Sequence, residues 1–161
     1  MTVVGCTGHQ SLTMQTQAAI ADEFLAQLLR LEDDDNLEGV CSLAVGADQI
    51  FARALLAAGG RLHVIIPCSG YLSTFTTAEA RASYKELLDL SASSERLAYG
   101  SPTEEAFMAA GRLVADRSDL LLAVWDGGPA AGLGGTADVV HYAKEHGKAV
   151  EIVWPKGAKR S

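Results

Sequence analysis

Residues 119–140 read DLLLAVWDGGPAAGLGGTADVV. The apolar run 120–125 is typical of a strand, and a helix is predicted to begin at Thr136, after a glycine-rich loop. Glycines allow backbone N–H groups to approach a ligand closely. The start of a helix adds unpaired N–H groups and the positive end of the helix dipole. The stretch therefore predicts a phosphate site for a nucleotide or sugar phosphate, but it does not specify a reaction.

Strand and helix signals alternate through the rest of the chain. The predicted strands are 3–6, 40–45, 62–66, 97–99, 120–125 and 150–154, and the predicted helices are about 14–31, 47–58, 76–90, 101–117 and 136–146. Most of these strands are continuous in apolar residues, which is typical of buried parallel strands. Alternation with short loops implies right-handed crossovers. We therefore predict the α/β class, with a Rossmann-like three-layer sandwich and a mostly parallel sheet of about six strands.

Two capping boxes set the predicted starts of the third and fourth helices. They are Thr76–Glu79 and Ser101–Glu104, and the second places Pro102 at the first helical position. We expect one Rossmann-like domain over residues 1–155, followed by a short basic tail over 156–161 that frays.

Three loops are expected to meet at one edge of this sheet, because ligands of such folds bind beyond the carboxyl ends of the strands. The loops are 5–10, 46–48 and 126–136. The candidate ligand-binding residues are Gly5, Thr7, Gly8, His9, Gly46, Asp48, Gly134, Gly135 and Thr136, together with Arg81 on a predicted helix. The glycines would admit the ligand, the hydroxyls and Arg81 would bind phosphate, and Asp48 would bind ribose hydroxyls.

Two carboxylates, Asp126 and Asp138, are the candidate catalytic residues. Alternatives without a ligand stay open. Asp48 and Asp138 also suit the first turn of a helix electrostatically. His9 is either a ligand contact or acid, or a loop histidine that caps the next helix. Arg81 is either a phosphate ligand or an exposed partner of a glutamate.

Composition limits the partners that we expect. The formal net charge is −7 over 161 residues, and the basic footprint that nucleic acids require is missing, so we predict no nucleic-acid partner. The three cysteines form no C-x-x-C pair, and the four histidines lack ligand spacing, so we predict no metal and no cofactor. No segment resembles a signal peptide or spans a bilayer, so we expect a cytoplasmic protein without a membrane partner.

The order of four short motifs resembles the SLOG superfamily. The motifs are Gly5–His9, Ser42–Asp48, Ser118-Asp119 and Gly134–Thr136. This superfamily joins Smf/DprA-like proteins to the LOG-type, cytokinin-activating phosphoribohydrolases. The resemblance implies a Rossmann-like fold that binds nucleotides or nucleotide-derived ligands, with some members acting as hydrolases and others as sensors. It also implies a homodimer.

The LOG-type hydrolases carry the motif Pro-Gly-Gly-x-Gly-Thr-x-x-Glu, which this chain matches only in part. Gly135 and Thr136 match its Gly-Thr pair. Ala131, Leu133 and Val139 stand at the positions of the proline, the second glycine and the catalytic glutamate.

Three hypotheses follow for function. The first is a binding protein, such as a sensor, for a small-molecule nucleotide such as a nucleoside phosphate or an ADP-ribose-like ligand. The alternative is an enzyme, either a nucleoside monophosphate phosphoribohydrolase or another N-glycosidic hydrolase or ribosyl-transferring enzyme, that uses Asp138 or Asp126. The third is a scaffold whose glycine-rich loop is only structural.

Overall fold

The computed structural model describes residues 2–31, 36–130 and 132–161. Ala131, at the proline position of the LOG motif, lies outside these ranges. The strands are β1 (Thr2–Gly8), β2 (Leu37–Cys41), β3 (Arg61–Ile66), β4 (Ser93–Arg96), β5 (Leu120–Val124) and β6 (Ala149–Ile152). The helices are α1 (Met14–Leu31), α2 (Ala47–Ala57), α3 (Ala78–Leu90), α4 (Glu104–Arg117) and α5 (Thr136–Glu145), with a short 3₁₀ helix, η1 (Tyr71–Thr74).

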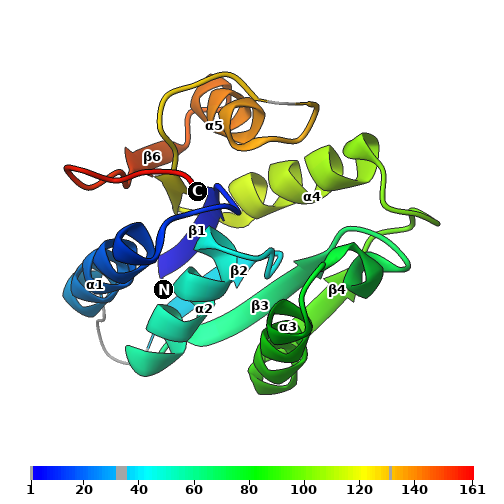
Figure 1. Ribbon diagram of the computed structural model, residues 1–161, viewed down its shortest axis with the longest axis horizontal. Helices are drawn as coiled ribbons and strands as arrows, with labels where there is room; N and C mark the ends of the chain where they lie inside the picture. The colour runs from blue at the N-terminus through cyan, green and yellow to red at the C-terminus, as the bar shows by residue number, and fades with distance from the viewer. Residues whose placement is uncertain (1, 32–35, 131) are drawn as a thin grey trace.

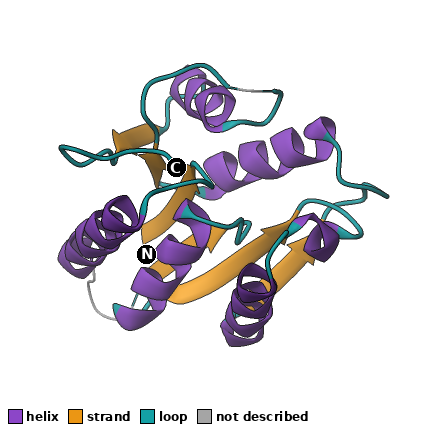
Figure 2. Ribbon diagram, in the orientation of Figure 1, coloured by secondary structure: helices purple, strands orange, loops and turns teal. Residues whose placement is uncertain are grey.

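Within the described ranges, the strands form one six-stranded sheet in the order β4-β3-β2-β1-β5-β6, and every pairing is parallel. Helices α1, α2 and α3 cover one face of the sheet, and α4 and α5 cover the other (Figure 1). Figure 2 shows the strands as a central layer between the two helical layers. The predicted α/β, Rossmann-like sandwich is therefore confirmed.

The strand order places a topological switch point between β1 and β5. The chain runs outward from β1 to β4 and then returns, so that β5 pairs with the free edge of β1, with Gly8 opposite Val124. The loops that follow these two strands separate to opposite faces of the sheet. The crevice between them is where open α/β sheets bind ligands.

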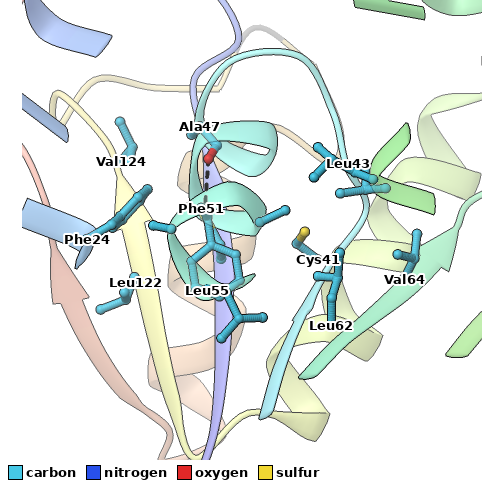
Figure 3. Packing of buried hydrophobic residues seen from close by; sticks show 14 of the residues in the cluster. Phe24, Cys41, Leu43, Ala47, Phe51, Leu55, Leu62, Val64, Leu122 and Val124 are labelled. Carbon is cyan, nitrogen blue, oxygen red and sulfur yellow. Dashed lines mark hydrogen bonds between the residues drawn. The ribbon is translucent and has the colours of Figure 1, made fainter. Parts of the chain in front are cut away.

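Each face of the sheet has its own apolar core, which explains why the strands are continuous in apolar residues. On the α1–α2 face, Phe24 and Phe51 meet edge to face, with ring centroids 5.7 Å apart. Figure 3 shows Phe51 and Leu55 of α2 over the sheet, between Leu122 of β5 and Leu62 of β3. The core on the α4–α5 face is built from Val40, Ile65, Ala110, Val114, Leu121 and Val139, among others.

The predicted bounds of two strands differ from those in the structure. Strand β2 was expected over 40–45 but covers Leu37–Cys41, and residues 42–46 form a turn in which Leu43 adopts a φ of +57°. Strand β4 was expected over 97–99 but covers Ser93–Arg96, whose side chains are all exposed. Strand β4 is held by backbone pairing with β3 and buries none of its side chains. Its sequence therefore needs no apolar residues and carries no apolar signal.

The two capping boxes identify the right helices, but they place the N-cap residue of each helix one or two positions too early. Thr77 accepts the N–H of Ala80 at 3.1 Å, and Thr103 accepts the N–H of Ala106 at 3.1 Å. In each case the hydroxyl residue nearer to the helix is the actual cap. Among the residues that the structure describes, no helix has both the length and the apolar character needed to cross a bilayer.

The basic tail does not fray. Residues 159–161 pair with the segment between β1 and α1, and the C-terminus lies beside the end of β1 (Figure 1). The N–H of Thr13 donates to the carbonyl of Lys159 at 3.2 Å, and the N–H of Lys159 donates to Oγ1 of Thr16 at 2.8 Å. Leu12 and Arg160 form an antiparallel bridge. The expectation of a frayed tail is therefore wrong.

Candidate functional site

A pocket of about 660 Å³ opens at the carboxyl ends of β1, β2, β3 and β5. Pockets of roughly 300–1,000 Å³ are typical of small-molecule sites. It draws on all three predicted loops. Thr7 and Gly8 end β1 and His9 follows it; Ser42, Ala44 and Asp48 follow β2; and Gly128, Gly134, Gly135 and Thr136 follow β5. The pocket therefore lies at the switch point and brings these loops together.

The glycine-rich loop presents the start of α5 to the pocket. Gly135 is the N-cap residue and makes no side-chain capping bond, and the carboxylate of Asp138 in the first turn accepts the N–H of the preceding Gly134 at 3.2 Å. Gly134 has a φ of +89°, and a Cβ added to it would lie 2.8 Å from the backbone N of Met108. A Cβ on Gly135 would lie 2.8 Å from the Cβ of Ala130. Local packing therefore requires glycine at both positions, and both line the pocket together with Thr136 at the start of α5.

His9 is a buried, neutral acceptor in the wall of the pocket. The backbone N–H of Asp126 donates to His9 Nε2 at 3.1 Å, which assigns the ring proton to Nδ1. Burial lowers the pKa of His9, the positive charge of Arg160 lowers it further, and Asp126 opposes both. The carboxylate of Asp126 lies 3.2 Å from the same nitrogen, but a neutral, accepting Nε2 makes no ion pair with it. His9 is therefore better placed to hold the loop than to carry a charge.

Asp126 is fixed by its own loop. The N–H of Gly128 donates to Asp126 Oδ1 at 2.8 Å, and this bond is the main reason why the pKa of Asp126 is lowered. Its second oxygen, Oδ2, lies 3.7 Å from Nη1 of Arg160. The carboxylate is ionised at neutral pH and faces a cation at the rim of the pocket.

Asp48 is a buried carboxylate in the pocket wall. Its Oδ2 accepts the N–H groups of Ser42 at 3.2 Å and Ala44 at 3.3 Å, which holds the turn after β2. Burial raises the pKa of Asp48 to about 7, and these two bonds act in the opposite direction. Burial also raises the pKa of the Cys6 and Cys41 thiols, and the charge of Asp48 adds to the effect. Both thiols are therefore protonated and poor nucleophiles.

Among the described residues, five predicted site residues lie outside the pocket wall: Gly5, Gly46, Arg81, Asp126 and Asp138. The two glycines have packing roles. Gly5 lies directly against the side chain of Ser118. Gly46 caps α2 with a φ of +86° and packs on the backbone carbonyls of His9 and Gln10.

Two of the charged candidates bond to nearby backbone. Nη1 of Arg81 donates to the carbonyl of Phe75 at 2.7 Å, which ties η1 to α3. Asp138 Oδ2 accepts the N–H of Gly134 at 3.2 Å, within the first turn of α5. No set of His, Cys, Asp and Glu side chains in the described part of the chain is grouped as metal ligands would be.

An aromatic wall and one cation complete the lining of the pocket. Tyr71, Phe75 and Phe107 line the pocket beyond β3, and the rings of Tyr71 and Phe75 meet with centroids 5.1 Å apart. Arg160 lines the opposite side. Arg160 is not among the predicted site residues, because residues 156–161 have the composition of a frayed tail and their basic character is the only signal.

Known proteins match this chain in fold rather than in sequence. No protein-family model and no curated protein sequence matches it. DNA processing protein A (DprA) from Streptococcus pneumoniae superposes with a TM-score of 0.67 at 19% identity, over 94% of this chain and 50% of that one. The chain therefore shares the fold of the DprA proteins. The resemblance inferred from the motifs is therefore confirmed for the fold, while the homodimer that it implies stays a prediction.

Two further structures extend the comparison. DNA processing protein A from Helicobacter pylori, which binds single-stranded DNA, gives a TM-score of 0.66 at 19% identity, over 99% of this chain and 68% of that one. The molybdenum cofactor carrier protein from Chlamydomonas reinhardtii gives 0.55 at 19% identity, over 94% and 75%. The chain thus spans half the length of the S. pneumoniae protein and about two thirds of the H. pylori protein.

The prediction of no nucleic-acid partner is wrong. The H. pylori protein has this fold and binds single-stranded DNA, so the fold is compatible with such a partner. The error lies in the use of net charge, which sums over the whole surface. A single strand is bound by local groups, namely backbone N–H groups, a few cations and aromatic rings on which bases stack.

Proposed function

We propose that the pocket at the β1–β5 switch point binds a nucleotide or a nucleotide-derived ligand, such as a nucleoside phosphate or an ADP-ribose-like molecule. One observation carries this proposal. A single pocket of about 660 Å³ has an aromatic wall on the β3 side and, on the β5 side, a helix start whose N-cap residue is a glycine. Those are the two surfaces that a base and a phosphate require.

The pocket residues suggest how such a ligand lies. The phosphate is placed at the start of α5, near Gly135 and Thr136, where N–H groups and the helix dipole favour an anion. The base is placed against Tyr71 and Phe107. Asp48 lies on the β2 loop between these ends, and its carboxylate is an acceptor for ribose hydroxyls.

Ligand binding is expected to raise thermal stability. At a free ligand concentration about 100 times Kd, binding to the folded state adds about 2.7 kcal/mol. That corresponds to a rise in Tm of roughly 5–10 °C for a chain of this size. The measurement is a thermal unfolding screen with AMP, NAD, ADP-ribose and a short single-stranded oligonucleotide, followed by calorimetric titration of those that shift Tm. The reference ligands are adenosine and ribose 5-phosphate, which each carry only part of the recognised group.

One outcome would contradict the proposal. If none of these ligands changes Tm or produces binding heat, the pocket is not a nucleotide site, and the glycine-rich loop has only a structural role.

The hydrolase alternative is tested on the same samples. Cleavage of a base–ribose bond needs a carboxylate near the anomeric carbon, and Asp48 lines the pocket whereas Asp138 bonds to Gly134. Purine and pyrimidine monophosphates are incubated with the protein, and free base is measured by chromatography. If free base is released and the release is lost in Asp48→Asn or Asp138→Asn, the protein is a hydrolase. Binding without release supports a binding protein or sensor.

A further inference from the structure

We propose that Arg160 is the anion-binding side chain of the pocket and holds a phosphate group of the ligand against the start of α5, with Asp126 as the counter-ion that the phosphate displaces. This inference rests on the proposed function and names the group that binds the charged part of the ligand. It assigns a ligand-binding role to a segment that the sequence motifs do not include.

The backbone around Arg160 is fixed before any ligand arrives. Lys159 is bonded on both sides, through its carbonyl to the N–H of Thr13 at 3.2 Å and through its N–H to Oγ1 of Thr16 at 2.8 Å. The N–H of Ser161 donates to the carbonyl of Ser11 at 3.2 Å. Arg160 therefore starts from an ordered position beside the loop that follows β1, so that little backbone entropy is lost when it binds.

The guanidinium of Arg160, in contrast, is loosely held. Its side chain is 49% exposed, and its nearest charged partner among the described residues, Asp126 Oδ2, is 3.7 Å away, too far for a hydrogen bond. No side-chain hydrogen bond joins Arg160 to any residue in the described ranges. Asp126 has other partners, since Oδ1 accepts the N–H of Gly128 at 2.8 Å. The arginine fork is thus available to a ligand.

Arg160 is also the one permanent cation among the described residues that line the pocket. His9 is close by, but it is neutral and its Nε2 already accepts a hydrogen bond. A planar guanidinium binds two phosphate oxygens at once and carries a full positive charge, which a neutral imidazole does not. Thr136 and Arg160 both line the pocket, and the proposal places the phosphate between them.

Asp126 sets the strength of this contact. Its negative charge balances Arg160 in the free protein and repels a phosphate that takes its place. An asparagine keeps an oxygen that accepts the N–H of Gly128 and removes the charge. Asp126→Asn is therefore expected to tighten the binding of a phosphate-bearing ligand.

The experiment is calorimetric titration of AMP and adenosine into matched variants. Arg160→Gln is expected to weaken AMP binding by about tenfold or more and to leave adenosine binding unchanged, because a charge-assisted bidentate contact is lost. The control is Lys156→Gln, which makes the same change of charge in the same segment at an exposed residue outside the pocket wall. It is expected to change AMP binding by less than about twofold, since exposed charges act weakly. Asp126→Asn is expected to tighten AMP binding several-fold.

Several results would overturn the inference. One is equal weakening by Arg160→Gln and Lys156→Gln, which would indicate only a general effect of charge. Another is a parallel loss of adenosine binding, which would indicate a structural role. If Arg160→Gln unfolds, Arg160→Lys replaces it, and it is expected to bind AMP with intermediate affinity because it keeps the charge without the fork. Wild-type protein that binds neither ligand would instead refute the proposed function itself.

Discussion

The Asp48→Asn variant is expected to be more stable than the wild-type protein near pH 8 and to match it near pH 4. Asp48 is buried, and its pKa is raised from 3.8 to about 7. Between these values the folded state holds a proton that the unfolded chain has released. The free energy of unfolding of the wild type therefore falls as pH rises, by up to about 1.4 kcal/mol per pH unit between about pH 4 and pH 7. Above about pH 7 the penalty is complete and constant.

Asparagine removes this penalty without removing the hydrogen bonds. The N–H groups of Ser42 and Ala44 both donate to one oxygen, Oδ2, which the amide oxygen of asparagine replaces. The measurement is urea unfolding at several values between about pH 4 and pH 8. Asp89→Asn, at an exposed position on α3, is the control and is expected to follow the wild-type profile. Identical pH profiles for Asp48→Asn and wild type would show that Asp48 is not a proton-binding group of the folded state.

The Gly8→Ala variant is expected to lose about 1–3 kcal/mol of stability and roughly 3–10 °C in Tm, because its methyl group has no space. A Cβ on Gly8 would lie 2.6 Å from the Cβ of Ala47 and 2.7 Å from the Cβ of Val124. Ala47 begins α2 and Val124 ends β5, so both sides of the pocket must move to accept it. AMP binding, where the wild type shows it, is expected to weaken as well.

Gly100→Ala is the matched control for this substitution. A Cβ at Gly100 meets nothing within 4 Å, so its effect on stability is expected to stay within about 0.5 kcal/mol. The two variants are compared by thermal and urea unfolding. If Gly8→Ala is as stable as Gly100→Ala, the close approach of β1, α2 and β5 is not the reason for a glycine at position 8.

Local sequence patterns were sufficient for the layers of this fold. The run 120–124 has only apolar residues, and the predicted strand there ends within one residue of β5. Strand β4 lacked such a pattern because an exposed edge strand needs only a backbone partner, which β3 provides. The end of β2 could not be read locally either. It depends on Asp48, whose carboxylate bonds to the freed N–H groups of the turn.

The residues of the candidate site likewise fall into those that the sequence predicts and those that it does not. Gly8 ends β1, and Gly134 and Thr136 come after β5. The carboxyl ends of these strands share one edge of the sheet, and the structure places all three residues at the pocket. Arg160 could not be found by that reasoning. Its position depends on pairing with Leu12, a contact between distant parts of the chain that leaves no periodicity in either segment.

Net charge is a poor guide to the partners of this protein for a related reason. A value of −7 describes the whole chain, whereas Arg160 and the start of α5 lie together at one pocket. Recognition of a phosphate depends on such local groups, so an acidic protein is able to bind an anion.

The docking of residues 159–161 beside β1 also determines where a segment attached after Ser161 would lie. Any polypeptide joined after Ser161, whether an affinity tag or a following module, would be anchored close to Arg160 at the mouth of the cavity. Tethering raises the local concentration of such a segment far above that in bulk solution. Acidic extensions would therefore compete with anionic ligands in cis, and an N-terminal fusion is the safer choice for affinity measurements.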